Sequence, residues 1–476
     1  MEEQFNESNR PVNPRRKKRS QIQIFKETYL PVLIAGVALI LIIVFIIGSI
    51  TRAVQKNKAE AAASIAASSS LAAEEARLEQ AAKDLIDQAD IMLAGYDYQG
   101  AIALLNTFEG DISKYPSLND KILQCEAAQK TLVSWSDPNQ IPNLSFQLLV
   151  ADSARGFNHE TYGYSINRNF ITTDEFSKIL QQLYDNGYIL VDLDDFTTTE
   201  IAANGTTVYK VKPIMLPNGK KPIMLTQTNV NYNYYLIDGD GDKIPDAKGT
   251  GIASKLLWNG SSFSCEMVDA NGQTVTGDFD LVPILEKFIQ KHPDFSYRGA
   301  RATLALTGYN GLFGYRTHPS AKELFGETAY QQAIQEAKRV ADALRKTGYT
   351  LACYTYENIA YGGISLTQIK GDMNSWTEEV VPILGHMDIL TYAQLSDISK
   401  DSEYSGEKYE ALRDLGFHYY LGFCEDGKPW ANITDSYVRQ GRIMVTGSNL
   451  AHHADWFTNM FDASSVLDST RGNVPG

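Results

Sequence analysis

The feature that most constrains the fold is a regular alternation of strand-like and helix-like segments that begins after Pro138. Short apolar runs rich in β-branched and aromatic residues alternate with segments of about 10–15 residues whose apolar side chains recur at helical spacing. This alternation is typical of βαβ units, in which helices cover a parallel sheet or barrel. We therefore predict that residues 138–476 form an α/β domain, a deformed (β/α) barrel.

The expected elements of this domain can be placed by residue range. We predict strands at 144–150, 188–191, 222–225, 302–307, 350–354, 418–423 and 442–445, and helices at 173–186, 281–291, 330–346 and 404–415. The stretch Lys221–Tyr232 reads as a buried strand that ends in a polar loop. Because α/β barrels carry their chemistry on the loops that follow the strands, this loop is expected to mark the functional site.

The N-terminal residues predict a membrane anchor. Residues 1–28 are polar and contain the basic cluster Arg15–Arg19, and residues 29–50 contain no charged side chain. At about 1.5 Å per residue this run is long enough to cross about 30 Å of hydrocarbon, whereas the apolar part of a cleaved signal peptide is shorter. The positive-inside rule then places residues 1–28 in the cytoplasm and the chain beyond residue 50 outside the cell, as a single-pass cell-membrane protein.

Two helical segments are expected between the membrane and the barrel. Residues 51–81 are rich in Ala, Glu, Gln and Lys, which favour a helical stalk. Residues 82–137 gain large apolar side chains at helical spacing and resemble one tetratricopeptide-like unit, while a packed helical neck remains the alternative. Such a neck is a candidate docking element for an envelope protein.

Charge and cysteine usage exclude some classes of function. The formal net charge of −14 argues against a nucleic-acid partner. The four cysteines lie far apart without a Cys-x-x-Cys pair, so they indicate neither a thiolate metal site nor a disulfide framework. A Cys353–Cys424 bridge and isolated buried cysteines both remain open.

The order of elements in the barrel domain resembles a known family. Helix 173–186 with Gly187–Phe196, then Thr226–Val230, then Leu344–Asn358, is similar to the order of motifs in polysaccharide deacetylases of the NodB type, carbohydrate esterase family 4. The resemblance covers roughly residues 141–450. It implies a deacetylase in which two histidines and an aspartate hold a divalent metal and a second aspartate acts as the base on metal-bound water.

The positions that match these groups carry neutral side chains. The base falls on Thr228 and the metal-binding aspartate on Asn229, and the two metal histidines fall on Tyr354 and Asn358. Amides and a protonated phenol are weak zinc ligands, so no transition metal is expected here. Leu450-Ala-His452 is similar to the late Leu-x-His motif of the family, which keeps His452 as a catalytic candidate.

The polar groups at these positions predict a glycan-binding cleft instead. The expected lining is made of amide, phenol and guanidinium side chains, namely Gln147, Asn229, Tyr232, Arg316, Tyr354 and Asn358. Amides and phenols pair well with sugar hydroxyls, and Arg316 is suited to a carboxylate on a sugar or peptide.

An acidic run lies next to the site loop. Asp238, Asp240, Asp242 and Asp246 stand at positions 1, 3, 5 and 9 of one short segment. This spacing lets a tight loop offer several oxygens to Ca²⁺. A hairpin turn built from Asp-Gly pairs explains the same residues, and both interpretations remain open.

These observations together predict a membrane-anchored, extracellular polysaccharide-deacetylase-like protein of the cell envelope. We expect a pseudoenzyme that binds cell-wall polysaccharide or peptidoglycan, or that scaffolds envelope proteins. The alternative is an active metal-dependent N-deacetylase with rearranged ligands, so the sequence leaves open whether the chain is an enzyme.

Overall fold

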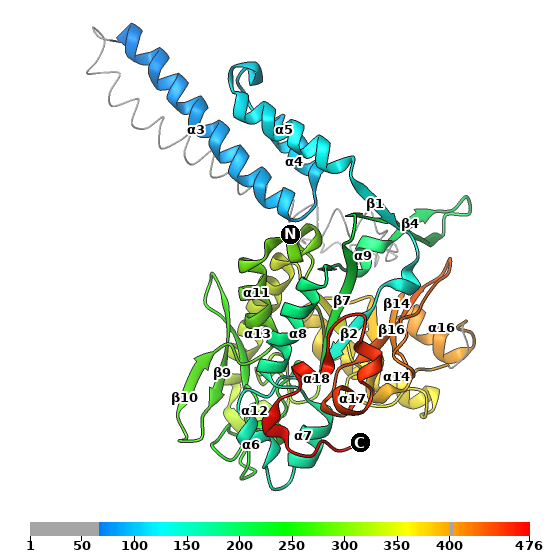
Figure 1. Cartoon of the computed structure of the whole chain (residues 1–476). Coiled ribbons are helices and arrows are strands. Elements are labelled where there is room, and N and C mark those ends of the chain that lie inside the picture. Colours follow the sequence, from blue (N-terminus) through cyan, green and yellow to red (C-terminus); the bar gives the residue numbers. More distant parts are fainter. Residues whose placement is uncertain (1–65, 400–402) are drawn as a thin grey trace, which may run out of the picture.

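The computed structural model of the chain describes residues 66–399 and 403–476 (Figure 1). The predicted cytoplasmic tail, the predicted transmembrane run 29–50 and the first part of the predicted stalk lie outside the described residues. Within the described ranges, no helix is both long and apolar enough to cross a membrane.

A closed barrel of parallel strands forms the centre of the molecule. Its strands pair in a ring in the order β2 (Asn143–Phe146), β7 (Lys221–Thr228), β11 (Thr303–Leu306), β12 (Thr350–Cys353), β13 (Ile389–Thr391), β14 (Tyr419–Phe423) and β16 (Val438–Met444). The ring closes because β16 pairs with β2. The short strand β3 (Tyr188–Leu190) adds to β7, and β15 (Ala431–Ile433) pairs antiparallel with β16. The prediction of an α/β barrel is confirmed.

The barrel strands are buried on both faces, as the strand β7 shows. Ile223 and Leu225 pack in the core cluster between the strands and the surrounding helices, whereas Met224 belongs to a second cluster. The Thr226 hydroxyl donates to Asn143 Oδ1 on the neighbouring strand β2 at 2.8 Å. Because side chains alternate along a strand, Met224, Thr226 and Thr228 face the barrel interior.

The outer helices form where the amphipathic pattern predicts them. Helix α8 (Thr173–Asp185) begins with a capping box between Thr172 and Glu175 and buries a stripe of apolar side chains, Phe176, Ile179, Leu180 and Leu183. Helix α11 occupies the predicted range Leu281–Lys291. Helices α13 (Glu327–Thr347) and α16 (Glu407–Asp414) lie within a few residues of their predicted ranges. A three-stranded antiparallel sheet of β8 (Lys255–Trp258), β9 (Phe263–Val268) and β10 (Thr274–Gly277) is inserted before α11.

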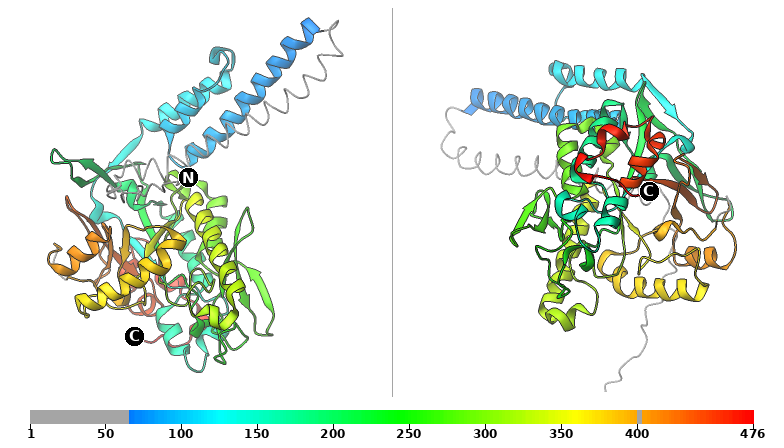
Figure 2. Two further views of the ribbon diagram at one scale, coloured as in Figure 1. Left: turned by 180° about the vertical axis from the view of Figure 1, so that it is seen from behind. Right: turned by 60° about the horizontal axis from the view of Figure 1, so that its bottom comes forward.

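A helical neck projects from one end of the barrel in all views (Figures 1 and 2). It consists of α3 (Ala66–Ala94), α4 (Tyr98–Leu105) and α5 (Pro116–Gln129). Helix α3 continues without a break across residues 81 and 82, so the described part of the predicted stalk and the start of the neck are one helix.

The turn between α3 and α4 joins the neck to the barrel. The Tyr96 hydroxyl donates to Asp294 O at 2.7 Å, the Arg298 amide donates to Gly95 O at 2.8 Å, and the rings of Tyr96 and Tyr297 stack. Asp294 and Tyr297 precede β11, so the neck contacts the amino ends of the barrel strands. The carboxyl ends of the strands therefore lie at the opposite edge, away from the neck.

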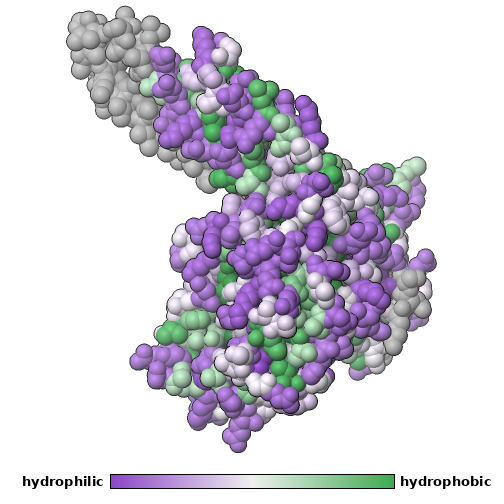
Figure 3. All heavy atoms as spheres, viewed as in Figure 1, coloured by the Kyte–Doolittle hydropathy of each residue, from purple (hydrophilic) through white to green (hydrophobic). Residues whose placement is uncertain are grey.

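All four cysteines lie in the described part of the chain, where they are buried and free. The Cys353–Cys424 bridge is not formed, and isolated buried cysteines are confirmed. The outer surface in the view of Figure 3 is mostly hydrophilic, with small hydrophobic patches among the polar side chains.

Candidate functional site at the carboxyl ends of the barrel strands

The predicted site residues lie mainly on three strands. Thr228 ends β7 and Asn229 follows it, Gln147 follows β2, and Tyr354 follows β12. The strand β2 is paired to β7, and β11 lies between β7 and β12. The fold therefore brings these four side chains to one edge of the barrel, which we call the barrel mouth.

Hydrogen bonds fix the loop that follows β7. Thr228 is fully buried, and its hydroxyl donates to Phe146 O at 3.2 Å. Asn229 has a positive φ of 62°, and its Oδ1 accepts a bond from Asn233 Nδ2 at 3.1 Å. The loop thus turns sharply at Asn229, which is a residue type that tolerates the left-handed region.

The buried amide of Asn231 connects this loop to the loop after β11. Its Nδ2 donates to Thr307 O at 2.6 Å and to Gly311 O, and its Oδ1 accepts a bond from the Thr307 amide at 2.9 Å. The Phe313 amide also donates to Val230 O at 3.1 Å. These bonds hold two of the mouth loops as one unit.

A buried arginine that sequence reasoning missed lies inside the barrel below Tyr354. Arg442 on β16 is fully buried and donates to Gly422 O at 2.9 Å, Tyr392 O at 2.7 Å and Ser145 Oγ at 3.2 Å. All three partners are neutral oxygens. Its guanidinium carbon is 5.9 Å from the centre of the Tyr354 ring. Burial lowers the pKa of Arg442 from its usual value.

The mouth residues do not fit a divalent metal. Amide and phenol groups are weak ligands for zinc, and the Arg442 guanidinium near Tyr354 would repel a cation. Across residues 66–399 and 403–476, the convergent group of His, Cys, Asp or Glu ligands is Asp238, Asp240 and Asp246, in the acidic loop. We therefore derive no metal-dependent step for this mouth.

The loop after β12 carries a side-chain oxygen without a protein partner. Asp372 pins this loop by accepting bonds from the amides of Tyr356 at 2.7 Å and Glu357 at 2.9 Å, and burial raises its pKa. Asn358 follows with a positive φ of 57°. Within the described residues, Asn358 Oδ1 and Thr307 Oγ1 are buried without a hydrogen-bond partner.

Tyr232 does not join Thr228 at the mouth. Its positive φ of 52° turns the side chain into the core outside the barrel, where its hydroxyl donates to Asp280 Oδ2 at 2.6 Å. The other oxygen of Asp280 accepts bonds from Gln227 Nε2 at 2.6 Å and from the Leu149 amide at 3.0 Å. Burial raises the pKa values of both Asp280 and Tyr232, and the network stabilises the loops around the mouth.

Arg316 also has a structural role in the loops. It donates to Tyr232 O at 2.9 Å and Asn310 O at 3.2 Å, and its guanidinium lies 4.1 Å from the centre of the Tyr234 ring. Burial lowers its pKa to about 10. His452, in α17 (Gly447–His452), is exposed, and its Nε2 lies 3.0 Å from Val474 O, so this ring has a partner in the C-terminal segment.

A row of aromatic side chains crosses the loops around the mouth, and sequence reasoning missed it. The ring centres of Tyr162 and Tyr235 are 5.5 Å apart, and those of Tyr162 and His159 are 5.2 Å apart. The pKa of Tyr235 is raised first by burial and then by the neighbouring phenols of Tyr162, Tyr309 and Tyr354. We call Tyr162, Tyr235 and Tyr309 the tyrosine row. Each of the three tyrosines lies in the segment that follows a barrel strand. This position is the one feature of the sequence that could have marked them as site residues.

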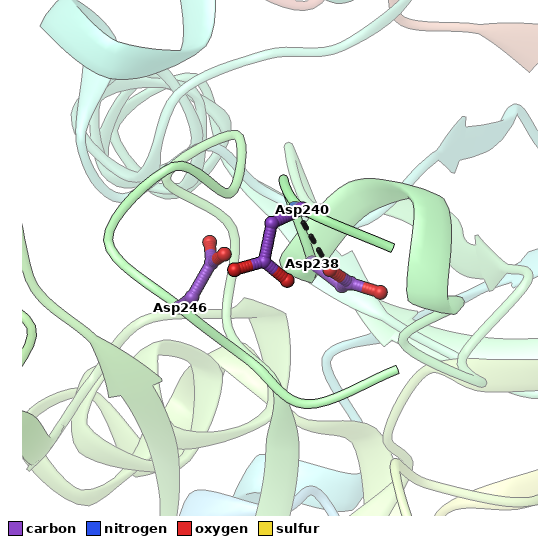
Figure 4. Close-up of side chains that lie close together, drawn as sticks. All are labelled: Asp238, Asp240 and Asp246. Atoms are coloured by element: carbon purple, nitrogen blue, oxygen red, sulfur yellow. Dashed lines mark hydrogen bonds between the residues drawn. The ribbon is translucent and has the colours of Figure 1, made fainter. Parts of the chain in front are cut away.

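The acidic loop partly gathers its carboxylates. Oxygens of Asp238, Asp240 and Asp246 lie within 4.8 Å of one another (Figure 4). Asp242 is not part of this group, and its Oδ1 accepts a bond from the Ile244 amide at 2.8 Å. Asp238 itself accepts bonds from the amides of Gly241 and Lys243, which is the geometry of a tight turn.

No protein-family model and no curated protein matches the sequence. Among solved structures, the chain is similar to a Streptococcus pyogenes deacetylase, PplD, in complex with acetate, at 11% sequence identity and a TM-score of 0.31. The match covers 67% of this chain and 95% of the other. The architecture described above rests on its own strand pairing.

Proposed function

We propose that the chain is a polysaccharide-deacetylase-like protein of the cell envelope that binds a cell-wall glycan at the barrel mouth and does not hydrolyse it. The anchor in this proposal is the apolar run 29–50, which would hold the barrel outside the cell. The family resemblance of residues 141–450 suggests the ligand class, and the side chains at the mouth suggest the loss of hydrolysis.

One observation carries the proposal. The partly exposed Asn358 has a side-chain oxygen without a partner within the described residues, and the mouth side chains are amides, hydroxyls and phenols near the Arg442 guanidinium. A buried polar atom without a partner costs about 1–3 kcal/mol. The partly exposed Asn358 amide could turn to offer this oxygen to a ligand rich in hydroxyl and amide groups, and a polysaccharide is such a ligand.

The test is retention of the full-length protein on immobilised peptidoglycan and on cell-wall polysaccharide. We expect Asn358→Gly and Asn229→Gly to weaken binding about threefold to tenfold, because each removes one hydrogen-bonding amide. Glycine keeps the positive φ of both positions, so the backbone is not strained.

The control variant is Lys243→Gly, which changes another positive-φ residue in an exposed loop. It should bind like the unchanged protein. Equal retention of all the variants would contradict the proposed site, and no retention of the unchanged protein would contradict the proposed function.

We also propose that the acidic loop binds Ca²⁺. Its carboxylates converge within 4.8 Å, and the proposed extracellular location would supply Ca²⁺ in the range where such loops bind, about 10⁻⁴–10⁻³ M. The ion would hold the insertion beside the mouth in one conformation and would not take part in catalysis.

Terbium luminescence excited through nearby tyrosines, followed by displacement with Ca²⁺, measures this binding. We expect Asp246→Asn to weaken binding about tenfold or more, since it removes one charged ligand. Asp242→Asn is the matched control, because it removes the same charge from the same loop but lies outside the convergent group. Equal weakening by the two variants, or no saturable binding, would contradict the proposal.

A further inference from the structure

We infer that the tyrosine row is the surface on which successive pyranose rings of an extended, neutral, β-linked glycan stack as they approach the barrel mouth. This inference rests on the proposed function and names the part of the ligand that lies outside the mouth. It assigns a role to Tyr162, Tyr235 and Tyr309, which contribute no hydrogen-bonding group to the mouth residues described above.

The row comes from separate loops, and the rings of Tyr162 and Tyr235 are in contact. Tyr162 lies between α6 (Ser153–Phe157) and α7 (Gly163–Asn169), and Tyr235 lies in α10 (Tyr234–Ile237). The Tyr234 amide donates to Asn310 Oδ1 at 3.1 Å, which joins the segment of Tyr235 to the loop of Tyr309. The loops after β2, β7 and β11 therefore form one surface.

This surface also connects to the mouth itself. The amides of Gly308 and Tyr309 both donate to Tyr356 O, at 3.0 and 3.1 Å, which ties the loop of Tyr309 to the segment that follows Tyr354. The loop of Tyr309 is thus held next to the segment that leads to Asn358.

Two of the three rings have the exposure that stacking on a ligand requires, while Tyr162 is partly buried and packs against the core. Tyr235 is 42% exposed and Tyr309 is 47% exposed, although both are large aromatic side chains on ordered loops. Tyr162 and Tyr235 are inclined at 59° to each other, so they are not stacked face to face. Aromatic faces attract apolar surface, and a β-linked pyranose presents its C–H groups on such a flat face. A run of several rings suits an extended chain better than a single sugar.

The test is the affinity of the full-length protein for soluble cellohexaose and chitohexaose, measured by calorimetry. We expect Tyr235→Ala and Tyr162→Ala each to weaken binding about fivefold to tenfold. Tyr235→Phe should bind like the unchanged protein, because it keeps the ring. Ile91→Ala on the neck, where the side chain is 72% exposed, should leave the affinity unchanged.

The outcomes separate this inference from the proposed function. If the unchanged protein binds an oligosaccharide and both alanine variants bind equally well, the stacking role is wrong while the proposed function stands. The stacking role is also wrong if Tyr235→Phe loses as much affinity as Tyr235→Ala. The hydroxyl, and not the ring, would then be the group that binds the glycan. If the unchanged protein binds no glycan, both are wrong. Because Tyr235 and Tyr309 are half-exposed, Tyr309→Ala serves as a further variant that should fold normally.

Discussion

Glu175→Gln is expected to lower the free energy of unfolding by about 3–5 kcal/mol, because it leaves a buried arginine without its countercharge. Glu175 and Arg471 are both almost fully buried, at 0% and 4% exposure. Arg471 donates to both carboxylate oxygens of Glu175, each at 2.6 Å. Glutamine keeps the shape, but its amide nitrogen replaces one oxygen that accepts two bonds, from Arg471 and from the Thr172 or Asp468 amide, so the loss combines the missing charge with unpaired N–H groups.

Urea unfolding of the full-length protein measures this effect. The matched comparison is the double variant Glu175→Gln with Arg471→Met, which removes the second charge as well and should be more stable than the sum of the two single changes predicts. A loss below about 1 kcal/mol for Glu175→Gln would show that this ion pair does not hold the C-terminal segment.

This ion pair also concerns the tyrosine row. Arg471 donates to Asn167 O at 2.8 Å and to Phe170 O at 2.7 Å, at the end of the helix α7 that follows Tyr162. The C-terminal segment therefore supports the loop that carries Tyr162. A loosened Arg471 should weaken glycan binding even though it lies outside the row.

Asn231→Ala is the second change with a large expected effect, a loss of about 2–4 kcal/mol in the free energy of unfolding. Its fully buried amide makes three bonds to the backbone of the loop after β11, and truncation leaves those groups unpaired. Because this amide joins the loops after β7 and β11, glycan binding should fall as well.

Thermal and urea unfolding together with glycan retention measure the two effects. Asn271→Ala is the control, since it truncates the same side chain at an exposed turn and should change stability by less than about 0.5 kcal/mol. A variant Asn231→Ala that unfolds at the same urea concentration as the unchanged protein would contradict the role of Asn231.

Local sequence patterns predicted most of the fold. The apolar stripe of helix α8 and its capping box depend on residues a few positions apart, and the predicted range of α11 was the observed one. The strand ends followed in turn, and the pairing of β2, β7, β11 and β12 places Gln147, Thr228, Asn229 and Tyr354 at one edge of the barrel.

The directions of side chains in the loops could not be predicted in this way. Tyr232 has a positive φ, which interrupts the alternation of side chains and turns its ring toward Asp280 instead of the mouth. Arg442 bonds to Ser145, which lies 297 residues earlier, and the rings of Tyr162 and Tyr235 come from different loops. Such contacts depend on how the barrel closes, and one sequence does not contain that information in any local pattern.

The central claim is that the barrel mouth binds a glycan without hydrolysing it. The most direct measurement is the acetate released from an N-acetylated glycan held by the full-length protein in the retention experiment, with Zn²⁺ added. The account predicts retention that depends on Asn358 and no acetate above the protein-free blank. Acetate that is released with the unchanged protein and lost with His452→Ala would contradict it.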